Sequence, residues 1–330
     1  MRFAIHAGAA YSSESLRFAK QIGCTDAIGG GPPAPSIGIE SPWHEVWKVE
    51  DLVKMKRQVE AHGLRLEVFE DCPPINKIML GYDGREEQLE NFCKSVENLA
   101  EADIRTINAS SACWIDEFGV WGRVAGTGTL PGRGGAQTRA FDYEEIKKLP
   151  LTEYGELTEE RTWENLAYLV NGVVPTLESC GVRLAFHPCD PPISPTQGFA
   201  RPLRSTETFD RLLNIAPTTD TIGLNFCQGC FSEMGEDIPT AIHHFGSQGR
   251  IFFGHFRDVK GAVPKFQEVL HDDGQTDMFN AMEAYYDVDF EGPMRPDHGI
   301  GLEGEAGWKM AKVFAIGYMK GLAESVEKTR

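Results

Sequence analysis

The sequence predicts an α/β fold, a (β/α)8 TIM barrel, formed by a single domain over residues 1–330. Short apolar runs alternate eight times with longer amphipathic segments, and this alternation produces parallel strands with right-handed crossovers. Eight such units are the number that closes into a barrel. The alternative is a doubly wound open sheet, which usually carries a glycine-rich fingerprint after its first strand. Residues 8–10 read Gly-Ala-Ala after the first run, which is not that fingerprint.

The predicted strands are apolar runs, several of them rich in Val, Ile and Phe, that are short enough to be buried on both faces of a sheet. They cover residues 3–7, 27–30, 64–69, 105–109, 182–187, 221–226, 251–256 and 290–295. Gly292 and Pro293 interrupt the last run, which gives it the weakest strand pattern of the set.

A helical pattern follows each predicted strand. The predicted helices cover residues 13–22, 50–62, 85–102, 159–180, 207–215, 238–247, 276–286 and 307–327. Thr158 stands before the acidic first turn of the longest helix, where a hydroxyl caps free backbone N–H groups. Gly181 follows the last periodic residue of the same helix, which is the usual place for a glycine stop signal.

Two long stretches without periodicity follow the second and fourth strands, at residues 31–49 and 112–157. On a barrel, the loops that follow strands lie on the face that carries active sites, and loops of this length are usually functional or mobile. We expect the tryptophans of these loops either to wall a binding pocket or to pack beneath the loops. They are Trp43, Trp47, Trp114 and Trp121.

Composition excludes several classes of partner. Lys and Arg total 32 and Asp and Glu total 49, which gives a formal net charge of −17. An acidic surface disfavours nucleic acid and anionic membranes, but a small anionic substrate can still bind in a locally basic site. No apolar run reaches the length of about 18 residues that spans a membrane. The eight cysteines are spread thinly and no signal-peptide pattern is present, so we expect a cytoplasmic protein with reduced thiols.

Four successive strands end in residues that can bind a metal ion: His187, Cys227, His255 and Asp297. Their spacing is close to one strand–helix–strand unit each time, so the four side chains can meet at one rim of the barrel. Two imidazoles, one thiolate and one carboxylate suit a divalent transition metal. On ligand softness alone, the thiolate favours Zn²⁺ or Fe²⁺ over Mg²⁺ or Ca²⁺.

Each of these residues also has a structural interpretation. A lone His or Cys at a strand end is more often a packed core residue than a ligand. Cys227 and Cys230 form a C-x-x-C pair, which is found in redox sites and in zinc ribbons. No second C-x-x-C accompanies it, which argues against a ribbon, and the gathering of four suitable groups on adjacent strands favours the metal site.

Eight sequence runs, in order and across nearly the whole chain, resemble the mannonate dehydratases of the xylose-isomerase-like barrel superfamily. They are HEVWKVEDLVKMK, FEDCPPI, HPCDPP, GLNFCQGC, FFGHFRDV, FQEVLHDDGQTDM, PMRPDHG and AIGYMKGL. The resemblance implies a hydro-lyase that converts D-mannonate to 2-keto-3-deoxy-D-gluconate. It also implies a homo-oligomer that acts on a small anionic sugar acid. The implied cofactor is Mn²⁺, with Fe²⁺, Co²⁺ or Zn²⁺ as alternatives, on His187, Cys227, His255 and Asp297.

The chain departs from the family pattern at three places. Cys189 stands where the family has an aspartate in its HPDDPP run, and the glycine-rich residues 126–135 replace a helical insertion after the fourth strand. Val313 occupies the position of a family tyrosine that acts in proton transfer, and Tyr318 lies five residues further along the same predicted helix.

Dehydration next to a carboxylate needs a base for the C2 proton and an acid for the departing C3 hydroxyl. We take His298 as the first candidate for this acid–base work, with Asp190 and His271 as further candidates. The alternatives are that His298 only supports the metal ligand beside it, and that His271 caps a helix.

Three residues are candidates for substrate binding. Arg257 can hold a carboxylate with two parallel hydrogen bonds, although it can equally pair with Asp258 or another acidic side chain at the rim. Glu70 follows the third strand and can orient a sugar hydroxyl or act as a base, and Arg295 belongs to the same set.

The sequence therefore predicts a metal-dependent sugar-acid dehydratase. The runner-up is a metal-dependent sugar isomerase or epimerase on the same barrel, because an enediolate forms there without loss of water. A non-catalytic sugar-binding protein is a third hypothesis, and four potential metal ligands argue against it.

Overall fold

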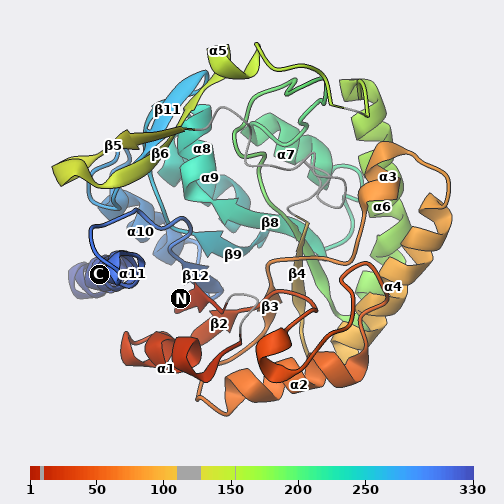
Figure 1. Cartoon of the computed structure of the whole chain (residues 1–330), viewed down its shortest axis with the longest axis horizontal. Helices are drawn as coiled ribbons and strands as arrows, with labels where there is room; N and C mark the ends of the chain where they lie inside the picture. The colour runs from red at the N-terminus through yellow and green to blue at the C-terminus, as the bar shows by residue number, and fades with distance from the viewer. Residues whose placement is uncertain (8–10, 110–127, 153) are drawn as a thin grey trace.

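Eight parallel strands form the centre of the computed structural model, which describes residues 1–7, 11–109, 128–152 and 154–330 (Figure 1). Their order in the sheet is β2-β1-β12-β9-β8-β7-β4-β3. The strands are β1 (Arg2–His6), β2 (Asp26–Ile28), β3 (Val68–Phe69), β4 (Thr106–Ala109), β7 (Arg183–Phe186), β8 (Ile222–Cys227), β9 (Ile251–His255) and β12 (Pro293–Arg295).

The two ends of this sheet meet, so that the strands form a nearly closed barrel. The N–H of Gly29, just past β2, donates to the carbonyl of Val68 in β3 at 2.9 Å. The N–H of Glu70 donates in return to the carbonyl of Gly29 at 2.8 Å. The predicted (β/α)8 barrel is thereby confirmed, and all eight strands direct their carboxyl ends to one mouth.

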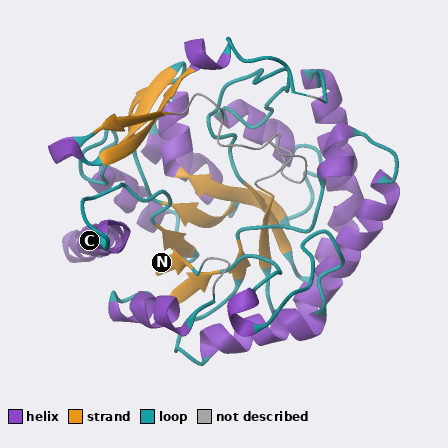
Figure 2. Cartoon of the chain, viewed as in Figure 1, coloured by secondary structure: helices purple, strands orange, loops and turns teal. Residues whose placement is uncertain are grey.

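Helices surround the barrel (Figure 2), and all eight predicted helices are confirmed. They are α1 (Ser13–Gln21), α2 (Val49–Glu60), α4 (Arg85–Glu101), α6 (Glu159–Cys180), α7 (Thr206–Leu213), α9 (Ile238–Gly246), α10 (Met278–Asp287) and α11 (Gly307–Thr329). The Thr158 hydroxyl caps α6 by accepting from the N–H of Arg161 at 3.3 Å, and Gly181 ends α6 in a left-handed conformation. Shorter helices are α3 (Asn76–Leu80), α5 (Tyr143–Ile146) and α8 (Gln228–Met234).

The core lies between the barrel and this helical layer. All six residues of β8 are buried, and Leu166, Leu169 and Val173 of α6 are fully buried on the face toward the strands. Burial of each such side chain contributes about 1.5–3 kcal/mol. Among the described helices, none has both the length and the apolar composition needed to cross a membrane.

A second sheet of four antiparallel strands lies beside the barrel. Its order is β10-β11-β6-β5, and its strands are β5 (Gly128–Pro131), β6 (Gln137–Asp142), β10 (Val259–Ala262) and β11 (Lys265–Glu268). Sequence analysis expected residues 112–157 to be irregular, but the described part of this stretch contains β5 and β6. The reason is tertiary: β5 is exposed throughout, and β6 pairs with β11, which lies more than a hundred residues further along the chain.

The loop after β2 is irregular, as expected, and a buried tryptophan anchors it against the barrel. Trp47 is 1% exposed and its ring lies 6.0 Å from that of Phe69, between centroids. Its indole N–H donates to the carbonyl of Trp43 at 3.2 Å. Trp47 therefore packs beneath the loop. Trp114 and Trp121 lie outside the described residues.

Candidate metal centre

The four predicted metal ligands meet at the carboxyl ends of four neighbouring strands. His187 follows β7, Cys227 ends β8, His255 ends β9 and Asp297 follows β12. One ligand atom from each lies within 4.8 Å of the ligand atoms of the other three. Because β7, β8, β9 and β12 are successive neighbours in the sheet, the barrel itself delivers residues that are 110 positions apart in the chain (297 − 187).

The hydrogen bonds of the two imidazoles direct one nitrogen of each ring into this group. Nδ1 of His187 donates to the carbonyl of Pro188 at 2.7 Å, which leaves Nε2 as the ligand atom. Nε2 of His255 lies 2.9 Å from Oε1 of Glu70. Nδ1 of His255 is then turned toward Oδ2 of Asp297 at 3.5 Å, is buried, and has no hydrogen-bond partner among the described residues. Metal-bound histidines usually have this arrangement, with the second nitrogen held by a carboxylate or carbonyl.

The pKa of the Cys227 thiol is shifted toward the ionised form that binds metals. Burial alone raises its pKa, but the hydrogen bond from Cys230 and the positive charge of Arg257 outweigh burial and hold the pKa well below its usual value. Burial and the neighbouring thiolate raise the pKa of Cys230 instead. The two sulfurs of the C-x-x-C pair therefore differ: Cys227 ionises more easily, and Cys230 keeps its proton and donates it in a hydrogen bond. Two nitrogens, one sulfur and one carboxylate oxygen fit a divalent transition metal.

Asp297 is held as a carboxylate between two arginines. Arg295 donates to Oδ1 at 2.8 Å and Nε of Arg257 donates to Oδ2 at 3.1 Å. Burial would raise the pKa of Asp297, but the positive charges of His298, His255 and Arg295 bring it well below its usual range. Asp297 therefore stays ionised although it is buried, as a metal ligand must.

Arg257 is enclosed by acidic side chains. Its guanidinium is 3% exposed and donates to Asp190 at 2.8 Å, to Glu233 at 2.7 Å and to Asp297. Asp258, considered from the sequence as a partner of Arg257, accepts instead from side chains such as Ser232 at 2.8 Å. Arg257 thus holds one metal ligand in place. Sequence analysis missed Glu233, which is fully buried on α8 and shows no distinctive motif.

Glu70 and Arg295 form a pair on the other side of the group. Arg295 donates to Oε1 of Glu70, the same oxygen that contacts Nε2 of His255. The second carboxylate oxygen of Glu70 lies 3.7 Å from Nε2 of His6. Glu70 and Arg295, two of the three residues assigned to the substrate from sequence, therefore lie beside the candidate metal ligands, and Glu70 orients His255.

His298 and Asp190 also lie at this mouth, together with a residue that sequence analysis missed. Nδ1 of His298 lies 2.6 Å from Oε1 of Glu268, which ends β11 and is 5% exposed. One polar atom each of Asp190, Glu268 and His298 lies within 4.8 Å of the other two. Burial would raise the pKa of Glu268, but the charge and hydrogen bond of His298 lower it, so Glu268 is ionised. The available sequence signal was its place shortly after the strand that ends in His255.

His271 lies apart from these groups. It is 4% exposed, is hydrogen-bonded to the backbone of Phe256, and is buried strongly enough that its pKa falls to about 4. It is therefore a neutral imidazole at pH 7. Its Nε2 has no hydrogen-bond partner among the described residues.

Two of the departures found in the sequence have clear positions. Val313 lies on α11 with 47% of its surface exposed, while Cys189 is fully buried. Tyr318 is half-buried and stacks on Phe314 with 6.3 Å between ring centroids. Tyr318 therefore packs along the outer helix beside Phe314.

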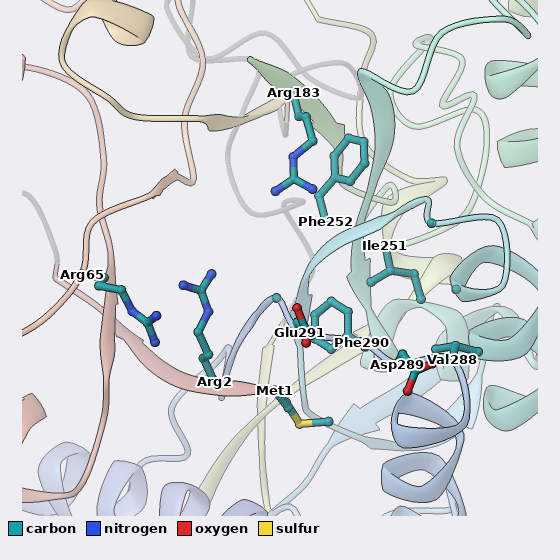
Figure 3. A pocket seen from close by; sticks show the side chains of 13 residues that line it. Met1, Arg2, Arg65, Arg183, Ile251, Phe252, Val288, Asp289, Phe290 and Glu291 are labelled. Atoms are coloured by element: carbon teal, nitrogen blue, oxygen red, sulfur yellow. The ribbon is translucent and has the colours of Figure 1, made fainter. Parts of the chain in front are cut away.

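A cavity of about 660 Å³ opens at the opposite mouth of the barrel (Figure 3). Its walls include Arg2 at the start of β1, Arg183 at the start of β7 and Ile251 at the start of β9. The metal-ligand group lies past the other ends of the same strands. This cavity is therefore separate from the candidate site.

Comparison with known proteins gives consistent matches. A family model described as D-mannonate dehydratase (UxuA) matches residues 8–149 and 123–330. Mannonate dehydratase of Thermotoga maritima is 33% identical over 328 residues, which cover 88% of this chain and 89% of that protein. Mannonate dehydratase 2 of Halalkalibacterium halodurans is 32% identical over 311 residues, which cover 85% of this chain and 88% of that protein.

Solved structures agree with the barrel. The crystal structure of mannonate dehydratase from Streptococcus suis serotype 2 aligns with a TM-score of 0.84 and 26% identity, over 100% of this chain and 93% of that one. L-ribulose 3-epimerase aligns with a TM-score of 0.61 and 12% identity, over 99% of this chain and 96% of that one. The second likeness concerns the fold alone.

Proposed function

Because the chain belongs to the mannonate dehydratase (UxuA) family, we propose that it removes water from D-mannonate and yields 2-keto-3-deoxy-D-gluconate. The observation that supports this most directly is the group of His187, Cys227, His255 and Asp297 at the catalytic mouth of the barrel. All four are buried or nearly so.

We propose Mn²⁺ as the cofactor, held by these four residues. When bound, a divalent cation supplies Lewis acidity that stabilises negative charge on the substrate carboxylate and its 2-hydroxyl. Fe²⁺, Co²⁺ and Zn²⁺ suit the same nitrogen, sulfur and oxygen donors, and availability decides between such metals as much as affinity does.

The proton transfers fall to His298 and Asp190 in this proposal. A base must accept the C2 proton, and an acid must give a proton to the C3 hydroxyl so that it leaves as water. The enol that remains becomes the 2-keto acid by taking a proton at C3. His298 presents Nε2 on the side of Asp297, 3.4 Å from Oδ2, because Glu268 holds its Nδ1. His271 forms a hydrogen bond with the backbone of Phe256 instead, so we assign it no proton transfer in the reaction.

Substrate binding follows from the local charge. The chain as a whole carries a net charge of −17, whereas Arg257 and Arg295 both border Asp297. Both guanidinium groups are already paired with carboxylates, so in this proposal a bound divalent cation would supply the positive charge that attracts an anionic sugar acid. We propose that Glu70, whose second oxygen faces His6, orients a hydroxyl of the bound sugar.

The test is turnover of D-mannonate by the chelator-stripped chain after reloading with Mn²⁺, Co²⁺, Fe²⁺, Zn²⁺ or Mg²⁺ in separate samples. We expect a 2-keto-3-deoxy acid with Mn²⁺ and none after chelation. If the metal-loaded chain instead isomerises or epimerises a sugar without loss of water, the protein is a metal-dependent sugar isomerase or epimerase and not a dehydratase. Binding of sugar acid by the metal-free chain, without turnover under any condition, would favour a binding protein.

A further inference from the structure

We propose that Glu268 is a positioning residue for the dehydration, and that the small antiparallel sheet exists at this mouth to place its carboxylate against His298. The proposal rests on the proposed function, because it assigns His298 to proton transfer. It goes beyond that function in giving a role to β5, β6, β10 and β11, which lie outside the barrel (Figure 2).

The contact itself is short and shielded from water. Oε1 of Glu268 lies 2.6 Å from Nδ1 of His298, and the Glu268 side chain is 6% exposed. A carboxylate accepts the proton of Nδ1–H, which fixes the ring and leaves Nε2 as the nitrogen that exchanges protons. The same Nε2 lies 3.4 Å from Oδ2 of Asp297, on the side of the metal-ligand group. Rotation of the ring would break the bond to Glu268 and move Nε2 away.

Glu268 is held rigidly by its strand. It ends β11, which pairs on one side with β10 and on the other with β6. Phe266 of β11 stacks on Phe141 of β6 with 5.3 Å between ring centroids, and Gln267 donates to the Thr138 hydroxyl at 2.7 Å. The carboxylate therefore projects from a strand that is fixed on both edges.

The loop that carries His298 is tied to the same sheet. Gln137, the first residue of β6, exchanges two backbone hydrogen bonds with Gly301, each 2.9 Å long. Gly301 lies three residues past His298. The small sheet thus fixes both partners of the Glu268–His298 bond, although these residues come from loops after different barrel strands. A sheet that only covered the mouth would need neither the Gln137–Gly301 pairing nor the Glu268–His298 bond.

The first test compares E268L, E268Q and the matched control E144L as metal-loaded enzymes. Leucine removes the acceptor, so we expect kcat to fall about 10²-fold, with KM and metal affinity changed less than about threefold. Glutamine keeps an oxygen that accepts from Nδ1–H, so we expect E268Q to recover kcat to within about tenfold of the wild type. E144L makes the same type of change at an exposed glutamate of α5 that pairs with Lys147 at the surface, so it should retain its kcat.

A double-mutant cycle with H298A separates positioning from a general structural role. If Glu268 acts through His298, E268L lowers kcat no further in the H298A background. A fall in kcat of the same size in both backgrounds, or a loss of activity in E144L equal to that in E268L, would overturn the proposal.

Crystal structures of metal-loaded E268L and E268Q give a result that does not depend on turnover. We expect the His298 ring to stay in place in E268Q and to rotate in E268L. A ring that keeps its orientation in E268L contradicts the proposal even if the dehydratase activity is found. Absence of dehydration by the wild type, together with a rotated ring in E268L, would instead remove the proposed function and leave the positioning role intact.

Discussion

Several side chains at this site are charged although they are buried, and an oppositely charged neighbour offsets the desolvation cost of each. Arg257 is bonded to Asp190, Glu233 and Asp297, and is 3% exposed. Removing one member of such a set leaves another charge buried and unpaired, which costs several kcal/mol. The ionisation of Cys227 depends on the same arginine. Metal affinity and local stability are therefore linked through a few side chains.

The two cysteines of the C-x-x-C pair should behave differently. C227S replaces a thiolate by a hydroxyl that stays protonated, so we expect metal affinity to fall at least about a hundredfold, measured by calorimetric titration. C230S keeps a hydrogen-bond donor beside Cys227 and should retain affinity within about tenfold. Equal losses in both variants would contradict the assignment of Cys227 as the ligand.

His271 should make stability depend on pH. Its pKa of about 4 in the folded chain lies below the usual value of 6.5, because burial disfavours the charged ring. Between these two pH values the unfolded chain binds a proton that the folded chain does not, so stability falls as pH drops from 6.5 to 4. Above pH 6.5 the residue contributes no pH dependence. The full loss is roughly 3 kcal/mol.

Urea unfolding in EDTA across pH 4 to 7 measures this effect without a contribution from the metal. H271N should flatten the curve relative to the wild type. H44N, which changes an exposed histidine, serves as the control and should leave the curve unchanged. The prediction fails if the wild type and H271N lose stability in parallel.

Helix α8 places its backbone at Gly229 directly against the charged guanidinium of Arg257. Cys227 is the residue just before its first turn, and Cys230 and Glu233 lie along it. Cys227 belongs to the candidate metal group, while Cys230 and Glu233 lie close to Asp190. Gly229 allows this approach. A Cβ at Gly229 would lie 2.4 Å from Nη1 and 2.6 Å from Cγ of Arg257, which is closer than atoms can pack.

G229A should therefore displace Arg257. Alanine normally improves a helix by up to about 1 kcal/mol over glycine, so a loss of about 1–3 kcal/mol here would show that the contact dominates. The control is G317A on α11, where a Cβ meets no atom within 4 Å. Thermal and urea unfolding of both variants, with a metal titration, measure the outcome. A G229A chain as stable as G317A would show that Arg257 accommodates the methyl group.

In the molecule as a whole, the four candidate metal ligands come from neighbouring barrel strands in the second half of the chain. Ligands that follow or end β7, β8, β9 and β12 come together only when these four neighbouring strands are paired. A bound ion therefore favours the folded barrel over the unfolded chain. That the chain is one domain and forms a homo-oligomer stays a prediction.

Metal removal should lower the melting temperature. At a free metal concentration of a thousand times Kd, the linkage contributes about 4 kcal/mol. We expect calorimetric scans with EDTA to show a melting temperature several degrees below that of the Mn²⁺-loaded protein. C227S should show only a small part of this difference. A metal-induced shift of full size in C227S would mean that the ion binds elsewhere.

The amino-acid pattern alone was enough to predict the eight barrel strands, the eight helices between them and the meeting of four candidate metal ligands. Eight alternating units leave few topologies, and polar residues at the ends of parallel strands gather at one edge whatever the loops do. His187 and Asp297 could be placed together for that reason alone. Stop and start signals such as Thr158 and Gly181 are local, so they too were readable in advance.

The pairing of the buried charges could be seen only in the folded chain. Glu233 and Glu268 have no local signature, and their roles arise because Arg257 and His298 arrive from other strands. The small sheet was hidden for the same reason, since the partner of β6 is β11, far along the chain. Periodicity reports which face of an element is buried. Hydrogen bonds between distant loops depend on where the folded backbone brings them, which no local pattern encodes.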